Sequence, residues 1–148
     1  MERTIKFRGK SISGDWVYGD LIQLDNQSCI AGSHQWATAL KNNSLELGVD
    51  EVITETIGQF TGLKDKNGVE IYEGDIVIEK SYPMYDNSLC NYRCVVVWDE
   101  EKTGFGLEMY VVSNRVRGCA VPDSISEYTE LEVIGNIHDN LELTTNLE

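Results

Sequence analysis

The chain has 148 residues, of which 41% are hydrophobic, enough for one substantial core but too few for two large domains. A formal net charge of −13 disfavours direct nucleic-acid binding, because a surface that follows phosphates needs clustered Lys and Arg. The charged opening MERTIKFRG and the lack of a long apolar run indicate neither a signal peptide nor a membrane span. We therefore expect a cytoplasmic protein with no membrane partner.

The N-terminal part of the chain is predicted to form a β-hairpin. Residues 4–8 alternate between polar and apolar side chains, residues 13–15 supply a turn, and residues 16–22 are aromatic and β-branched enough to return as the partner strand. Basic side chains at alternate positions, among them Lys6 and Arg8, are expected on the solvent face of the first strand. We assign residues 1–49 to this hairpin and a connecting segment, packed on the rest of the protein.

Residues 56–79 carry the strongest strand and turn signals in the chain. Asn67-Gly68 is the pair that best tolerates positive φ at both central positions of a two-residue hairpin turn. In the strand that follows, Tyr72 is predicted to face solvent, because it shares the charged face of the strand. Gly74 marks a second turn, and the β-branched run after it predicts a buried strand.

The second half of the chain contains a predicted loop, a hairpin and a last strand. Residues 80–92 have no sustained period and predict a loop insertion. Residues 93–98 and 105–112 predict a hairpin with a charged turn between its strands. The last strand is expected at residues 131–137, and residues 139–148 are expected to be a loosely held tail.

Four separate stretches of the chain resemble one protein family. They are IKFRG (residues 5–9), GDWVYGDLI (residues 14–22), QFTGLKDKNGVEIYEGDIV (residues 59–77) and EVIGNIHDN (residues 132–140). In this order they are similar to the YopX family of phage and prophage proteins, and the resemblance covers nearly the whole chain. It implies an SH3-type small β-barrel, carriage on phage or other mobile elements, and a bacterial host. It implies no catalytic residues and no cofactor.

The strand pattern and the resemblance together predict a mainly β fold, with an SH3-like small β-barrel in residues 50–148 and the N-terminal hairpin added to it. Gly58 and Gly135 occupy the same place in a shared Ile-Gly-amide-apolar pattern. A glycine inside a strand permits a sharp bend or a close backbone approach. We predict that the strands at residues 57–60 and 134–137 pair antiparallel and close the barrel.

The sequence contains no recognisable catalytic motif or metal site. Cys90 and Cys94 have the spacing of a zinc half-site, but no second pair completes it, and reduced thiols are expected. His34 and His138 stand alone, away from any nucleophile motif. We therefore expect no enzyme activity, no metal and no cofactor. The enzymatic alternative is a small hydrolase that uses one histidine with a cysteine or a carboxylate.

The expected function is that of a non-enzymatic binding or assembly protein. Tyr72, Tyr82 and Tyr85 are the predicted binding residues, because aromatic side chains on a solvent face or in a loop commonly contact partners. The expected partner is a host or phage protein, and the need to cover strand edges predicts a homo-oligomer. A further alternative is an acidic mimic of nucleic acid that acts on a host protein.

Overall fold

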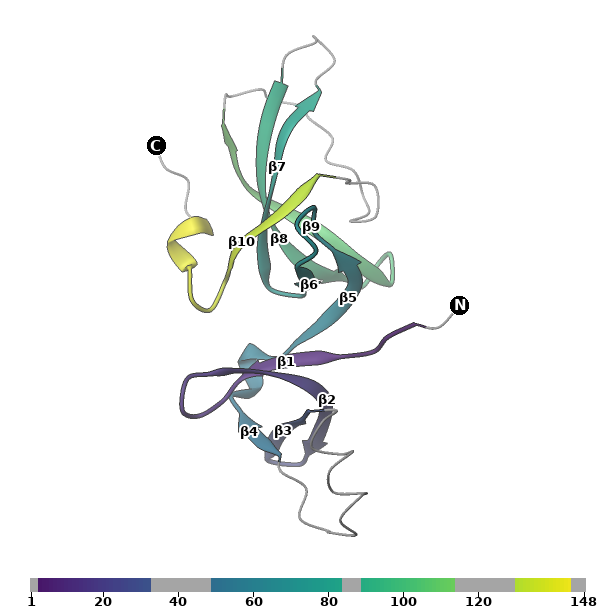
Figure 1. The fold of residues 1–148 in the computed structure, drawn as a ribbon, viewed down its shortest axis with the longest axis vertical. Helices are drawn as coiled ribbons and strands as arrows, with labels where there is room; N and C mark the ends of the chain where they lie inside the picture. Colours follow the sequence, from purple (N-terminus) through teal and green to yellow (C-terminus); the bar gives the residue numbers. More distant parts are fainter. Residues whose placement is uncertain (1–2, 33–48, 84–88, 114–129, 145–148) are drawn as a thin grey trace. The chain divides into compact units, whose positions relative to one another are not determined.

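The computed structural model describes residues 3–32, 49–83, 89–113 and 130–144 of the chain. Their regular structure is antiparallel β-sheet with short 3-10 helices, which confirms the predicted mainly β fold (Figure 1). No helix within these ranges is long and apolar enough to cross a membrane.

The chain divides into two compact units, Met1–Gly62 and Leu63–Glu148. The division falls inside strand β5 (Gly58–Lys64), later in the chain than the boundary expected between residues 49 and 50. Each unit therefore contains part of one continuous strand, and each is described by itself below.

The first unit is an antiparallel sheet with the strand order β4-β3-β2-β1-β5. Its strands are β1 (Phe7–Lys10), β2 (Trp16–Leu24), β3 (Gln27–Ala31), β4 (Asp50–Val52) and the start of β5. The predicted hairpin of β1 and β2 is confirmed, with Phe7 opposite Gly19 and Lys10 opposite Trp16. Strand β3 then continues the meander by pairing with β2.

Two glycines allow the strands of the first unit to pack closely. A Cβ atom on Gly9 would lie 3.0 Å from Cβ of Val52 and 3.2 Å from Cδ1 of Ile30, and both of these residues are buried. A Cβ atom on Gly19 would collide with the main-chain carbonyl of Ala31. These positions belong to the segments IKFRG and GDWVYGDLI, which therefore have a packing role.

The solvent face predicted for β1 is wrong at Arg8. This side chain is only 6% exposed, and its guanidinium carbon lies 4.8 Å from the centre of the Trp16 ring. Nearby, Nζ of Lys6 lies 5.5 Å from the centre of the Phe60 ring. Long basic side chains can cover aromatic surface while the cation interacts with the ring face. The alternation of polar and apolar residues correctly predicted a strand, but it did not show that the charged Arg8 on this strand is buried.

The second unit contains a sheet with the strand order β10-β7-β8-β9, and strand β6, which pairs with β5. Its further strands are β6 (Glu70–Tyr72), β7 (Asp75–Pro83), β8 (Leu89–Asp99), β9 (Gly104–Ser113) and β10 (Leu131–Asn136). The predicted hairpin of β8 and β9 is confirmed. Ile76, Val77 and Val96 of the central strands β7 and β8 are fully buried and form the centre of its core.

The loop predicted for residues 80–92 is largely wrong. Strands β7 and β8 run through it, with Tyr82 opposite Cys90 and Pro83 opposite Leu89, and residues 84–88 lie outside the described ranges. The register of the pair shifts between Glu79 and Tyr82. A register shift breaks the two-residue alternation from which a strand is recognised in sequence, although the backbone hydrogen bonds continue beyond it.

The turn at Asn67-Gly68 is confirmed, but its geometry differs from the prediction. Gly68 has a φ of 83°, whereas Asn67 is not among the described residues with positive φ. Asp65 organises the turn: its main-chain N–H donates to the Val69 carbonyl at 2.7 Å, and its carbonyl accepts the N–H of Gly68 at 3.0 Å. This is the three-residue hairpin loop that ends in a left-handed glycine, not the two-residue turn.

The predicted pairing of the strands around Gly58 and Gly135 is wrong. Gly58 lies opposite Arg8 of β1, whereas Gly135 lies opposite Ile76 of β7, and the two strands belong to different sheets. Gly135 stands at a register shift in β10, and a Cβ atom there would lie 2.5 Å from Oδ1 of Asn140. The absence of a side chain at Gly135 makes room for Asn140, which lies in the loop after β10. The pattern that Gly135 shares with Gly58 does not reveal this contact.

A different contact ties the end of β5 to β10. The main-chain N–H of Lys66 donates to the Leu131 carbonyl at 3.0 Å, and the N–H of Val133 donates to Oδ2 of Asp65 at 3.0 Å. Nζ of Lys66 also lies 3.1 Å from Oε2 of Glu132. Residues 65–66, rather than 57–60, therefore meet the last strand.

The tail is held in place as far as residue 144. A short 3-10 helix, η3 (Leu141–Thr144), ends the described chain, and Nη1 of Arg93 in β8 donates to the Leu143 carbonyl at 3.2 Å. The expectation of a loosely held tail is thus wrong for residues 139–144, while residues 145–148 lie outside the described ranges.

Candidate partner-binding surface

Cys94 is a buried thiol whose surroundings suppress its reactivity. Its side chain is 2% exposed, and burial, with a further contribution from the Glu79 carboxyl, raises the pKa of the Cys94 thiol to about 12. The thiolate is the nucleophilic form of cysteine, so this residue is a poor nucleophile at neutral pH. Cys29 is also buried. The Cys90 side chain and Cys119 lie outside what the structure describes.

Glu79 is a buried acid of the second unit. It is 8% exposed, and its Oε2 atom has no hydrogen-bond partner. Burial, and then the nearby charge of Glu130, raise the pKa of the Glu79 carboxyl. A carboxyl group and the Cys94 thiol thus lie in one buried region where neither group readily ionises. This arrangement opposes the thiolate that cysteine-based hydrolysis would require.

The histidines and acids offer no metal site in the described chain. No group of three or more His, Cys, Asp or Glu side chains is arranged there to hold a metal ion. His138 follows β10 and lies near the turn at Gly74, while His34 falls in the undescribed range 33–48. Asp75, next to that turn, uses Oδ2 to accept the Tyr72 N–H at 2.8 Å, which is a structural role.

The prediction that Tyr72 faces solvent as a binding residue is wrong. Its side chain is 2% exposed, and its hydroxyl donates to Oε2 of Glu70 at 2.9 Å. Ile71 is also buried, so neither face of the short strand β6 is exposed at this point. Tyr82 lies in β7, but its side chain is not described, and Tyr85 falls in the undescribed range 84–88. The three tyrosines are therefore not shown to share a surface.

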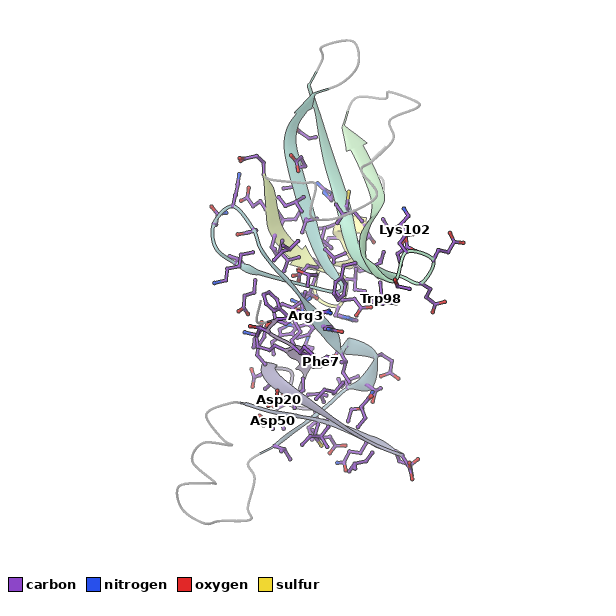
Figure 2. All side chains as sticks on the ribbon, turned by 90° about the vertical axis from the view of Figure 1, so that its right-hand side faces the viewer. Arg3, Phe7, Asp20, Asp50, Trp98 and Lys102 are labelled. Atoms are coloured by element: carbon purple, nitrogen blue, oxygen red, sulfur yellow. The ribbon has the colours of Figure 1, made fainter. Side chains whose placement is uncertain are left out.

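An aromatic pair, with one exposed and one half-buried ring, lies instead at the end of the β8–β9 hairpin. Trp98 and Phe105 are opposite each other in the ladder, and their rings meet edge to face, with centroids 5.2 Å apart and planes at 80°. Trp98 remains 44% exposed, and it lies near the end of the strand that leads into the hairpin tip with Lys102; Figure 2 labels both residues. Partly exposed tryptophan that contacts another aromatic ring is a common anchor in protein interfaces.

The tip that carries this pair is held in a defined conformation. Oδ1 of Asp99 accepts the main-chain N–H groups of Glu101 at 3.0 Å and Lys102 at 3.2 Å. Thr103 has a φ of 51°, and it is the one non-glycine residue with positive φ in the described ranges. Left-handed backbone is costly for a β-branched residue, so the surrounding turn must impose it.

The surface formed by residues 98–105, here called the hairpin-tip surface, was missed by the sequence reasoning. Trp98 ends the predicted strand at residues 93–98, and large aromatic side chains on such strands are usually buried for the most part. The signal that could have found it is the charged run DEEK that follows at once, because a large side chain at the last strand position beside a solvated turn extends beyond the core.

Comparison with known proteins places the chain in a family. The model of the YopX protein family matches residues 6–145. The chain belongs to the YopX family. Among solved structures it is similar to the crystal structure of protein EF1440 from Enterococcus faecalis, with a TM-score of 0.51 and 23% identity over 97% of this chain and 99% of that one. That likeness concerns the fold alone. A comparison with curated proteins finds no match.

The segments through which the chain resembles YopX proteins have structural tasks. Gly9 and Gly19 admit neighbouring strands in the first unit, and Asp65 binds three main-chain N–H groups in the second. Gly135 makes room for Asn140, whose Oδ1 accepts the Asn136 N–H at 3.3 Å. These residues shape the backbone, so their presence supports a shared fold and supplies no chemistry.

Proposed function

We propose that this YopX protein is a non-enzymatic binding or assembly protein of a prophage or related mobile element, acting in the bacterial cytoplasm. The proposal is carried by the hairpin-tip surface, where Trp98 is 44% exposed on a tip that hydrogen bonds hold in place. Its partner is a host or phage protein. Exposed tryptophan supplies more binding energy per residue than most side chains, which supports a protein interface here.

The non-enzymatic character is supported by the state of the best candidate nucleophile. The raised pKa of Cys94 and its 2% exposure leave it little thiolate and little access to substrate. Burial also raises the pKa of the neighbouring Glu79 carboxyl, which disfavours its charged form. A hydrolase would need its nucleophile and base in a reachable cleft, so this pair favours a structural assignment.

The proposal includes an SH3-type barrel, formed by the strands of the second unit. Its support is the contact between the β5–β6 turn and β10, where Lys66, Asp65 and Glu132 link strands of the two sheets. Such a link along an otherwise open edge is what closure of a small barrel requires.

We also propose self-association through β9. In the described chain this strand pairs with β8 along one edge only. A long strand edge presents unpaired N–H and C=O groups, and pairing with a second copy covers them. Sedimentation should show an oligomer, and a concentration-independent monomer of 16.7 kDa would contradict self-association.

The test of the binding function compares Trp98→Ala with Tyr18→Ala, a matched change at an aromatic residue of the first unit that is 48% exposed. Proteins retained from nuclease-treated host lysate would be identified, purified and titrated against each variant. Trp98→Ala should weaken the purified partner about tenfold or more, equal to about 1.4 kcal/mol, and Tyr18→Ala should have little effect. Equal affinities of the wild type and the Trp98→Ala variant, with circular dichroism showing both folded, would remove the hairpin-tip surface as the interface.

A further inference from the structure

The charges around Trp98 indicate what kind of partner the hairpin-tip surface accepts. Asp99 is engaged within the turn: Oδ1 accepts two main-chain N–H groups, and Oδ2 lies 3.9 Å from Nζ of Lys102. The acids next to it, Glu100 and Glu101, are exposed, and their carboxylates have no ion pair among the described residues. The tip therefore presents two carboxylates of unmatched charge immediately after an exposed indole ring.

An indole ring beside carboxylates is a favourable environment for a guanidinium group. Tryptophan gives the strongest cation–π contact of the aromatic residues, and a planar guanidinium can stack on the ring while its N–H groups bond to carboxylates. Trp98 is 44% exposed, and its ring is nearly perpendicular to that of Phe105, so Phe105 does not cover the indole as a parallel stacked ring would. Lysine could satisfy the charge, but it lacks the planar group that matches both partners.

The charge of the chain favours the same class of partner. The tip has three acids, Asp99, Glu100 and Glu101, against one base, Lys102, and the whole protein has a net charge of −13. An acidic peptide or a nucleic acid would be repelled by this surface, whereas a basic segment would be attracted to it.

We infer that the hairpin-tip surface binds an arginine-rich segment of a protein partner, with a guanidinium group on Trp98 and ion pairs to Glu100 and Glu101. This inference rests on the proposed binding function and specifies the chemistry of its partner. The turn held by Asp99 fixes the backbone that carries Glu100 and Glu101, which lowers the backbone part of the ordering cost on binding.

The direct test uses a hexa-arginine peptide as the probe and the full-length protein, labelled with ¹⁵N. The indole N–H signal of Trp98 would be assigned with the Trp98→Phe variant. Saturable shifts should appear at this signal and at the main-chain amides of Glu100 and Glu101. The Glu100→Gln/Glu101→Gln double variant should bind about tenfold more weakly, and a hexa-glutamate peptide should not bind.

The matched control removes the same two charges elsewhere. Asp50 and Glu51 are neighbouring exposed acids in β4, and the Asp50→Asn/Glu51→Gln variant should keep its affinity for hexa-arginine within about twofold of the wild type. Equal weakening by both double variants would mean that only net charge matters and would overturn the inference. Peptide shifts confined to residues away from the tip would overturn it as well.

The two proposals fail in different ways. If hexa-arginine leaves the Trp98 signal unmoved while Trp98→Ala still weakens a purified partner, the arginine chemistry is wrong and the binding function stands. If Trp98→Ala leaves the partner's affinity unchanged, the hairpin-tip surface is not the interface, and a response to hexa-arginine does not rescue the inference.

Discussion

Asp65→Asn should destabilise the second unit more than its nearly isosteric change suggests. The Asp65 carboxylate accepts three main-chain N–H groups: Asn67 at 2.8 Å and Val69 at 2.9 Å through Oδ1, and Val133 at 3.0 Å through Oδ2. An asparagine can keep the first two bonds through its carbonyl oxygen. Its NH₂ group then faces the Val133 N–H, so two donors oppose each other.

The magnitude follows from the lost contact. A hydrogen bond to a charged group contributes about 1.5–3 kcal/mol, and a buried donor left unsatisfied costs about 1–3 kcal/mol. These contributions overlap, so we expect a loss of about 2–3 kcal/mol, equal to roughly 4–12 °C in the thermal midpoint. Asp99→Asn is the matched control, because Asp99 also accepts two N–H groups in a turn but reaches no distant strand. It should cost less than about 1 kcal/mol.

The assay combines thermal unfolding, followed by circular dichroism, with amide hydrogen exchange. Exchange at Val133 should accelerate in the Asp65→Asn variant, because that amide loses its acceptor, and should stay unchanged in the Asp99→Asn variant. Equal thermal midpoints for the two variants, or an unchanged Val133 amide, would show that Asp65 does not hold β10 to the β5–β6 turn.

The pH dependence gives an independent check on Asp65. Burial opposes its ionisation, but the N–H groups of Val133, Val69 and Asn67, with the charge of Lys66, outweigh burial and lower the pKa of the Asp65 carboxyl from 3.8. For an acid with a depressed pKa, the stabilisation is present above the unfolded value and is lost as pH falls through the folded value. The stability difference between wild type and Asp65→Asn should therefore hold at neutral pH and shrink below pH 3.8.

Three further results are expected from buried groups and a tight glycine. Glu79→Gln should raise stability at neutral pH, because it removes a charge that burial and Glu130 disfavour. The gain should shrink as pH falls and vanish below 4.5, where the Glu79 carboxyl is protonated in both the folded and the unfolded state. Cys94 should resist iodoacetamide in the folded protein at pH 8 and react in denaturant, as read by mass spectrometry; rapid native labelling would contradict its burial. Gly135→Ala should lower the stability measured by thermal unfolding by about 1–3 kcal/mol, and by less when Asn140 is also changed to Ala. Gly104→Ala is the control and should be nearly neutral, because its new Cβ would meet only a carbonyl at 3.8 Å. If the costs of the changes at 135 and 140 simply add, the proposed collision between the two residues is excluded.

Signals that act over a few residues predicted the local structure well. The β1–β2 and β8–β9 hairpins follow from alternating, β-branched segments on either side of polar turns. Gly68 and Gly74 both have positive φ, as their turns require. At Asn67 a turn was correctly predicted, but its type was wrong. The side chain that fixes the loop is that of Asp65, and an aspartate at this position does not by itself distinguish the two turn types.

Features that depend on distant contacts were not predictable from the sequence. Tyr72 lies on the strand face that its alternation predicts to be exposed, yet Tyr72 and its neighbour Ile71 are both buried, so both faces of β6 are covered. The pattern shared by Gly58 and Gly135 suggested a pairing that does not form, because one glycine lies in the β1–β5 ladder and the other accommodates Asn140. A glycine's sequence context shows that something approaches closely, but not what approaches.

The candidate site was also predicted only in part: the sequence predicted its hairpin, but not the exposure of the hairpin's end. The four segments quoted for the resemblance leave out residues 78–131, although the family model matches residues 6–145, and the glycines and acids of these segments hold strands and turns together. The hairpin-tip surface lies between them, in a hairpin whose strands were predicted but whose exposed end was not. Residues that fix a backbone constrain one another closely, whereas an exposed tip can change its side chains with little cost to the fold. The proposed partner-binding function therefore concerns Trp98, Glu100 and Glu101 rather than the residues of the four segments, whose contacts described above are structural.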